Sequence, residues 1–161
     1  MDIAAPLNQL AELDMPAEHV FIVENLQTGL SFGQLPGSVV IMQLGYAVDV
    51  LERLPWVVSA HCIYWGDLDT HGFVILHRAR SYLPELESVL MDRQTLHRHR
   101  DLWVEEKSQH GAESLPHLSE SEAAVYQAIK HNFWGYNVRL EQERIAWNFA
   151  WNALQQAMRA D

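Results

Sequence analysis

The most constraining feature of this sequence is an apolar stretch, residues 61–66, that leads directly into Asp67 and Asp69. Residues i and i+2 of an extended segment point to the same side, so the two carboxylates face one region of space. Carboxylates held together repel each other, and a bound divalent cation relieves that repulsion. The pattern therefore predicts a buried strand, a cation-binding turn and then a helix.

A second apolar stretch, residues 19–24, is short, β-branched or aromatic, and ends in Glu24. Strand-end side chains of an open α/β sheet lie in the crevice where such folds bind ligands. We therefore interpret Glu24, Asp67 and Asp69 as one acidic site that holds Mg²⁺ or Mn²⁺ and carries the chemistry. Whether Glu24 is a ligand or a general base stays open, as does the number of ions.

Strand patterns alternate with helical patterns, which predicts an α/β fold with a parallel sheet of about four strands flanked by helices, plus extra C-terminal helices. The expected strands are 19–24, 38–42, 61–66 and a weaker 87–91. The expected helices are 45–54 ended by Pro55, 70–83 ended by Pro84, one that begins with a capping box at 119–122, and a long one over 139–160. Residues 105–118 are expected to form a loop. Residues 1–17 are interpreted as a short helical lead-in or a severed linker, and 18–161 as the domain that carries the acidic site.

Three further acids are candidates for a second ion. Asp92 follows the weak fourth strand, where a turn or helix cap is the alternative role. Glu141 and Glu143 open the expected final helix. Glu143 shares the helical face of Trp147, whereas Glu141 suits the first turn of a helix through the helix dipole.

The net charge of −10 limits what the chain does alone. Phosphate contacts supply most of the affinity of a protein for DNA, so an acidic chain is a poor autonomous binder. If DNA is the substrate, His71, Arg139 and Arg144 are the candidate contacts, and something else must help to hold it. The His97–Arg100 run is interpreted first as a solvated helix face.

Several classes are disfavoured. No apolar run is long enough to span a bilayer, the N-terminus lacks a signal-peptide pattern, and the single cysteine, Cys62, suits a buried core position. A reducing, cytoplasmic location is expected. No phosphate-cradling Gly-x-x-x-x-Gly-Lys loop is present, so nucleotide hydrolysis is not expected.

Two Asp-x-Asp families fit poorly. A haloacid-dehalogenase-type phosphatase has its motif after the first strand and Thr or Val two residues beyond it, where this chain has His71. A response-regulator receiver has paired acids after strand one and a single acid after strand three, the reverse of the order here.

The arrangement instead resembles the Toprim domain of topoisomerases, primases and several nucleases, whose signature is a Glu after the first strand and Asp-x-Asp after the third. Asp-Leu-Asp-Thr-His-Gly is similar to the Asp-x-Asp-Pro-x-Gly form of topoisomerase VI, with Thr70 in place of proline.

The words Val-Glu-Asn-Leu, Ile-Tyr-Trp-Gly-Asp-Leu-Asp-Thr-His-Gly-Phe, Arg-Ser-Tyr-Leu-Pro and Arg-Leu-Glu-Gln-Glu-Arg-Ile resemble JetD/MksG, the nuclease subunit of Wadjet-type plasmid-defence systems. This resemblance covers about residues 18–155. It implies an endonuclease that cuts double-stranded plasmid DNA, works with condensin-like SMC, kleisin and accessory subunits, and carries an additional N-terminal region.

Two other functions stay open: a Toprim-shaped scaffold that docks partners without cutting, and a topoisomerase-like strand-cleaving enzyme. The second needs a nucleophilic tyrosine, and none of the five tyrosines has the expected context. The oligomeric state, a homodimer included, stays open as well.

Overall fold

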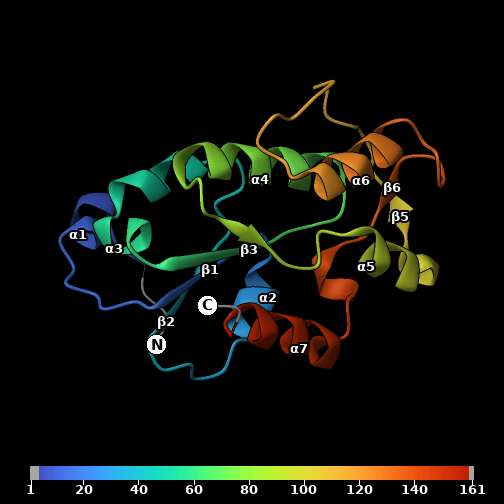
Figure 1. Ribbon diagram of the computed structural model, residues 1–161. Coiled ribbons are helices and arrows are strands. Elements are labelled where there is room, and N and C mark those ends of the chain that lie inside the picture. Colours follow the sequence, from blue (N-terminus) through green and yellow to red (C-terminus); the bar gives the residue numbers. More distant parts are fainter. Residues whose placement is uncertain (1–3, 160–161) are drawn as a thin grey trace.

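A computed structural model describes residues 4–159 of the chain and contains a four-stranded parallel sheet (Figure 1). The strands are β1 (His19–Val23), β2 (Ser38–Met42), β3 (His61–Trp65) and β4 (Glu87–Ser88), in the order β2-β1-β3-β4. Val23 is in register with both Met42 and Trp65, so β1, β2 and β3 end at the same edge. The α/β prediction is confirmed, and the residues that follow β1 and β3 emerge side by side.

Helices cover both faces of this sheet, as parallel strands buried on both sides require. In Figure 1, α4 and α6 lie on one face and α2 and α7 on the other. The helical elements are α1 (Leu7–Ala11), α2 (Leu26–Leu30), the 3₁₀ helix η1 (Val48–Arg53), α3 (Pro55–Val58), α4 (Thr70–Tyr82), α5 (Arg93–Arg98), η2 (Arg100–Leu102), α6 (Glu120–Lys130), η3 (Gln142–Arg144) and α7 (Trp147–Ala157). Among the described residues, no helix is long and apolar enough to cross a membrane.

Two helix starts follow the expected capping chemistry. Asp69 is the N-cap of α4, where its Oδ1 accepts a hydrogen bond from Gly72 N–H at 2.7 Å. Ser119 and Glu122 form the capping box of α6, each side chain accepting a hydrogen bond from the backbone N–H of the other. Side-chain oxygens here satisfy N–H groups that have no partner within the helix.

The predicted single helix over 139–160, whose last residue lies outside the described range, is wrong. A second sheet pairs β5 (Val104–Glu105) with β6 (Val138–Arg139) in antiparallel fashion, and Leu140 exchanges two backbone hydrogen bonds with Leu68. Between residues 139 and 159 only α7 is α-helical, and its Trp147 and Trp151 pack against Phe32 as a buried face requires. Pairing with distant segments outweighs local helical periodicity before residue 147.

Two smaller boundaries also differ from expectation. Residues 45–54 do not form one α-helix. Val48 and Leu51 of η1, and Leu54 just after it, are buried at a spacing of three residues, which is the period of a 3₁₀ helix. Pro55 begins α3 rather than ending a helix. The fourth strand stops at Ser88, because Leu90 adopts a positive φ of 62°.

Candidate functional site

Glu24 and Asp67 lie at neighbouring strand ends that are tied together by Gln142. The Gln142 side chain is fully buried, and its Oε1 accepts hydrogen bonds from the N–H groups of Glu24 (3.0 Å) and Asn25 (2.7 Å). Its Nε2 donates to the carbonyl of Trp65 at 3.3 Å, and its backbone N–H donates to Asp67 Oδ1 at 2.8 Å. One amide therefore fixes both strand ends. Sequence reasoning missed Gln142, since an isolated glutamine carries no spacing signal.

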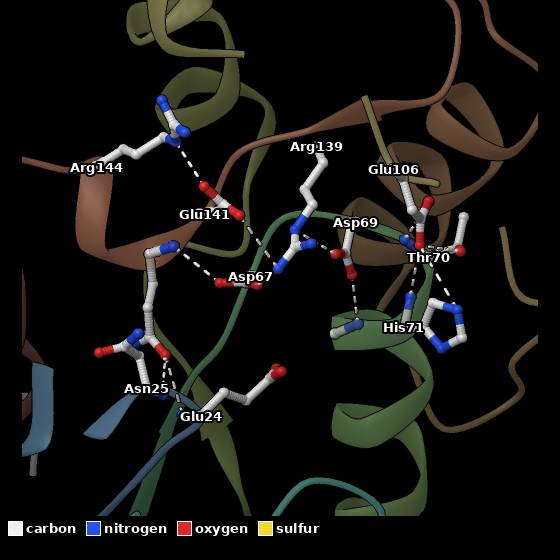
Figure 2. Close-up of polar contacts among 12 residues, drawn as sticks. Glu24, Asn25, Asp67, Asp69, Thr70, His71, Glu106, Arg139, Glu141 and Arg144 are labelled. Atoms are coloured by element: carbon white, nitrogen blue, oxygen red, sulfur yellow. Dashed lines mark hydrogen bonds and ion pairs between the residues drawn. The ribbon is translucent and has the colours of Figure 1, made fainter. Parts of the chain in front are cut away.

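A guanidinium group bridges the two aspartates of the motif. Arg139 Nη2 lies 2.6 Å from Asp67 Oδ2, and Arg139 Nε lies 3.1 Å from Asp69 Oδ2 (Figure 2). The same Nη2 is 3.5 Å from Glu141 Oε1. In this structure Arg139, predicted as a DNA contact, is the counter-ion of the acids. The antiparallel β6 strand, not a helix, places it there.

Glu24 turns toward these acids (Figure 2), and its Oε1 contacts the hydroxyl of Tyr64. Tyr64 is fully buried, and its hydroxyl contacts both Glu24 Oε1 and the carbonyl of Gly72, the latter at 3.0 Å. A phenol has a single hydrogen to donate. Both contacts are satisfied together when Glu24 is protonated, so that Glu24 donates to Tyr64 and Tyr64 donates to Gly72.

The electrostatics favour that protonated state. Burial, and then the charge of Asp67, raise the pKa of Glu24 from 4.5 to about 8, against the hydrogen bond from Tyr64. Burial also raises the pKa of Asp69 to about 6; Glu106 and Asp67 add to the rise, while Gly72 N–H and Arg139 oppose it. The cluster thus favours a cation or a proton at neutral pH.

Two glycines of the motif allow this crowding. A Cβ atom on Gly66 would overlap Glu24 Oε1 and the Tyr64 hydroxyl, and one on Gly72 would overlap the carbonyl oxygen of Asp67. Glycine is the residue that permits such close approach of backbone to neighbouring groups. The segment Gly66–Gly72 therefore needs its two glycines for packing, apart from any role of its aspartates.

A buried carboxylate that sequence reasoning missed lies at the start of α4. Glu106 is only 3% exposed, and its carboxylate accepts hydrogen bonds from Thr70 Oγ1 (2.6 Å) and Thr70 N–H (3.3 Å). It belongs to the segment predicted to be a loop, which offered no pattern to single it out. His71 lies beside it, contacting the Tyr46 hydroxyl through Nδ1 and the Ser108 carbonyl through Nε2 at 2.9 Å. His71 is thus at the edge of the site, with both ring nitrogens engaged.

The other candidates lie at varying distances from the acids. Glu141 reaches Arg139 and also pairs with Arg144 Nε at 2.6 Å, so both lie on the rim. Glu143 is exposed on η3 and does not share a buried face with Trp147, because residues 142–144 are not part of α7. Asp92 is the N-cap of α5, with its Oδ1 accepting from Thr95 N–H at 2.7 Å. It lines a separate hollow of about 670 Å³ between β4 and the start of α6.

The donors suit a hard divalent cation, although the side chains do not enclose one as they stand. Glu24, Asp67 and Asp69 supply only carboxylate oxygens, which Mg²⁺ and Mn²⁺ prefer. Yet across residues 4–159 no group of three or more His, Cys, Asp or Glu side chains has the arrangement of a metal site. Arg139 lies between the aspartates, and Glu24 is hydrogen-bonded to Tyr64. Both would have to move for the three acids to share one ion.

Comparison with known proteins identifies a family. A search of curated proteins found no match. The family model described as "Wadjet protein JetD, C-terminal" matches residues 1–154, which is nearly the whole chain and includes the segment before β1. The chain therefore belongs to the Wadjet JetD C-terminal family, and so to the components of Wadjet defence systems.

Proposed function

We propose that this chain is the Mg²⁺- or Mn²⁺-dependent, Toprim-type endonuclease domain of a Wadjet complex, cleaving phosphodiester bonds of plasmid DNA. The observation that carries the proposal is that Asp67 and Asp69 both pair with one cation, Arg139, beside Glu24, whose pKa is raised by burial. A buried acidic cluster of this kind is costly unless positive charge is bound in it.

The residues have separable roles in this proposal. A divalent ion held by Glu24, Asp67 and Asp69 supplies charge stabilisation and water activation for phosphodiester hydrolysis. Glu24 has a pKa of about 8, so it is mostly protonated at neutral pH. It would therefore release a proton on binding a divalent metal ion. Gln142 holds the backbone of Glu24 in place, and Tyr64 holds its side chain while no ion is bound.

Arg139 then has two successive partners. Without a metal ion its guanidinium neutralises Asp67 and Asp69. If a metal ion displaced it from them, its planar fork of N–H donors would be available for a phosphate. This exchange reconciles its position as a counter-ion with its predicted role as a DNA contact.

The family membership supports the setting of the reaction. We propose that condensin-like SMC, kleisin and accessory subunits bring plasmid DNA to the site. An acidic chain of net charge −10 binds a polyanion only weakly by itself, and such subunits would supply the missing affinity.

A non-catalytic scaffold is the second candidate, and one observation favours it. Arg139 already neutralises the aspartates, and the described residues hold no ready three-ligand metal arrangement. In that case the acidic cluster would stabilise the turn after β3 rather than bind an ion.

The two functions are separated by a plasmid nicking and linearisation assay with Mn²⁺ on the assembled complex. Asp67→Asn should abolish cleavage, a loss of at least about 100-fold, because it removes a charged ligand without changing shape. Asp49→Asn removes an equal charge from an exposed pair with Arg78 and should leave cleavage intact. Full cleavage by Asp67→Asn would refute the catalytic role and favour the scaffold.

A further inference from the structure

Three arginines of one short segment, residues 93–100, each lie over an aromatic ring. The guanidinium carbon of Arg98 is 4.9 Å from the ring centre of Phe149, that of Arg100 is 5.4 Å from Trp103, and that of Arg93 is 5.6 Å from Trp134. The arginines come from α5 and η2, whereas two of the rings come from the turn before β6 and from α7. We call these six residues the arginine–aromatic face.

These arginines differ from the two that lie beside the acidic site. Arg139 and Arg144 are paired with carboxylates. Within residues 4–159, none of Arg93, Arg98 and Arg100 makes an ion pair or a side-chain hydrogen bond, and all three are exposed. The nearest acids along the chain do not neutralise them, since Asp92 caps α5 and Asp101 is exposed and forms no ion pair within the same range.

The geometry leaves the useful part of each guanidinium free. A guanidinium that lies over a ring can keep its in-plane N–H donors available, and within residues 4–159 none of the three uses them in a side-chain hydrogen bond. The ring also limits the motion of a flexible side chain, which lowers the entropy lost when it grips a ligand. Planar N–H forks match phosphate oxygens in bidentate fashion.

A further residue, His97, packs against two of the three aromatic rings. The His97 ring packs edge-on against Trp134, with centroids 4.6 Å apart, and against Trp103 at 5.7 Å. Burial, with the charges of Arg93 and Arg100, lowers the pKa of His97, so it adds no charge of its own at neutral pH. Trp103 and Trp134, which are distant in the chain, are thereby held as one surface.

This face adjoins the acidic site through the small β5–β6 sheet. Trp103 directly precedes β5, whose Val104 is paired with Arg139, and Arg139 contacts Asp67 and Asp69. In Figure 1, α5 lies next to β5 at the same end of the molecule as β6. One short sheet therefore connects the segment that carries the arginines to the acidic site.

We propose that the arginine–aromatic face binds the phosphate backbone of duplex DNA and places it next to the acidic site. Its three arginines have no acidic partner among the described residues. Their positive charge, in an otherwise acidic chain, is complementary to phosphate and therefore indicates a phosphate-bearing ligand. The choice of DNA rests on the proposed function, but binding at this face needs neither a metal ion nor cleavage.

The test is fluorescence anisotropy of a labelled duplex with the purified chain in EDTA, titrated at several salt concentrations from about 20 to 200 mM. The binding variant is Arg93→Gln/Arg98→Gln/Arg100→Gln. The matched control, Arg53→Gln/Arg78→Gln/Arg159→Gln, removes equal charge from exposed arginines elsewhere. The binding variant lacks three phosphate-binding cations, so its slope of log affinity against log salt should be smaller by about 2.7. Between about 50 and 200 mM salt, the affinity of the wild type should therefore fall roughly 40-fold more than that of the binding variant.

Two results would overturn the inference: an unchanged slope in the binding variant, or an equal loss in the control. The triple lysine variant at the same positions keeps the charge, so it should keep most of the slope with weaker affinity. If it falls to the glutamine level, the loss reflects damaged packing of the rings, and the inference also fails. Because all titrations lack metal, a failure of cleavage by the complex leaves this result unaffected.

Discussion

Replacing Glu24 with glutamine should stabilise the metal-free protein while removing its response to a divalent cation. Glu24 has a pKa of about 8 in the folded chain against 4.5 for an ordinary glutamate. The folded state therefore binds this proton more tightly than the unfolded state does. Its stability contribution is complete below pH 4.5 and is lost as the pH rises through about 8.

The size of the effect follows from that difference. Over the whole interval the lost stability is roughly 5 kcal/mol, at about 1.36 kcal/mol per pKa unit, and roughly 3 kcal/mol of it is already lost at pH 7. A neutral carboxamide reproduces the protonated acid beside Tyr64 without this loss. Glu24→Gln should thus gain roughly 2–3 kcal/mol at pH 7, or about 5–10 °C in Tm, and nothing below about pH 4.5.

Urea and thermal unfolding in EDTA from about pH 4.5 to 8.5 measure this gain, with exposed Glu52→Gln as the control. Added Mn²⁺ should then raise the Tm of the wild type and leave that of Glu24→Gln nearly unchanged, since binding to the folded state alone stabilises it. If Glu24→Gln were destabilised by the same amount at every pH, Glu24 would be an ordinary structural hydrogen-bond partner. Its raised pKa would then not govern the stability of the protein.

Two further predictions concern the frame around the site. Gly72→Ala should destabilise the chain by roughly 2 kcal/mol or more in urea unfolding, because the added Cβ would overlap the carbonyl oxygen of Asp67. Gly111→Ala is the control, since nothing lies within 4 Å of a Cβ there. Equal effects of the two substitutions would contradict the clash. Burial alone would raise the pKa of Glu122, but hydrogen bonds from Arg80, Ser88 and Ser119 outweigh it and lower the pKa to about 2. This stabilisation is present above pH 4.5 and is lost as the pH falls through about 2, so Glu122→Gln should cost roughly 3 kcal/mol at pH 7 and progressively less toward pH 2; a pH-independent cost would point to packing instead.

Local pattern was sufficient for the elements that carry the acids. The strands before Glu24 and Asp67 were predictable from apolar, β-branched runs, and the start of α4 from the capping chemistry of Asp69. The neighbouring positions of β1 and β3 follow less directly, but parallel strands ending in acids indicated a common edge. The geometry of Figure 2 depends on the actual register of Val23 with Trp65.

The sequence by itself thus determined the α/β class, the parallel sheet and the expectation that Glu24 meets Asp67 and Asp69 at one edge. These depend on short-range chemistry that repeats with the period of a strand or helix. Only the tertiary structure decided what meets those acids. Arg139, Gln142 and Glu106 arrive from distant segments of the chain, where pairing of β6 with β5 and of Leu140 with Leu68 overrides helical periodicity. Such contacts have no local pattern, because their energy comes from satisfying buried charges and backbone groups across the fold.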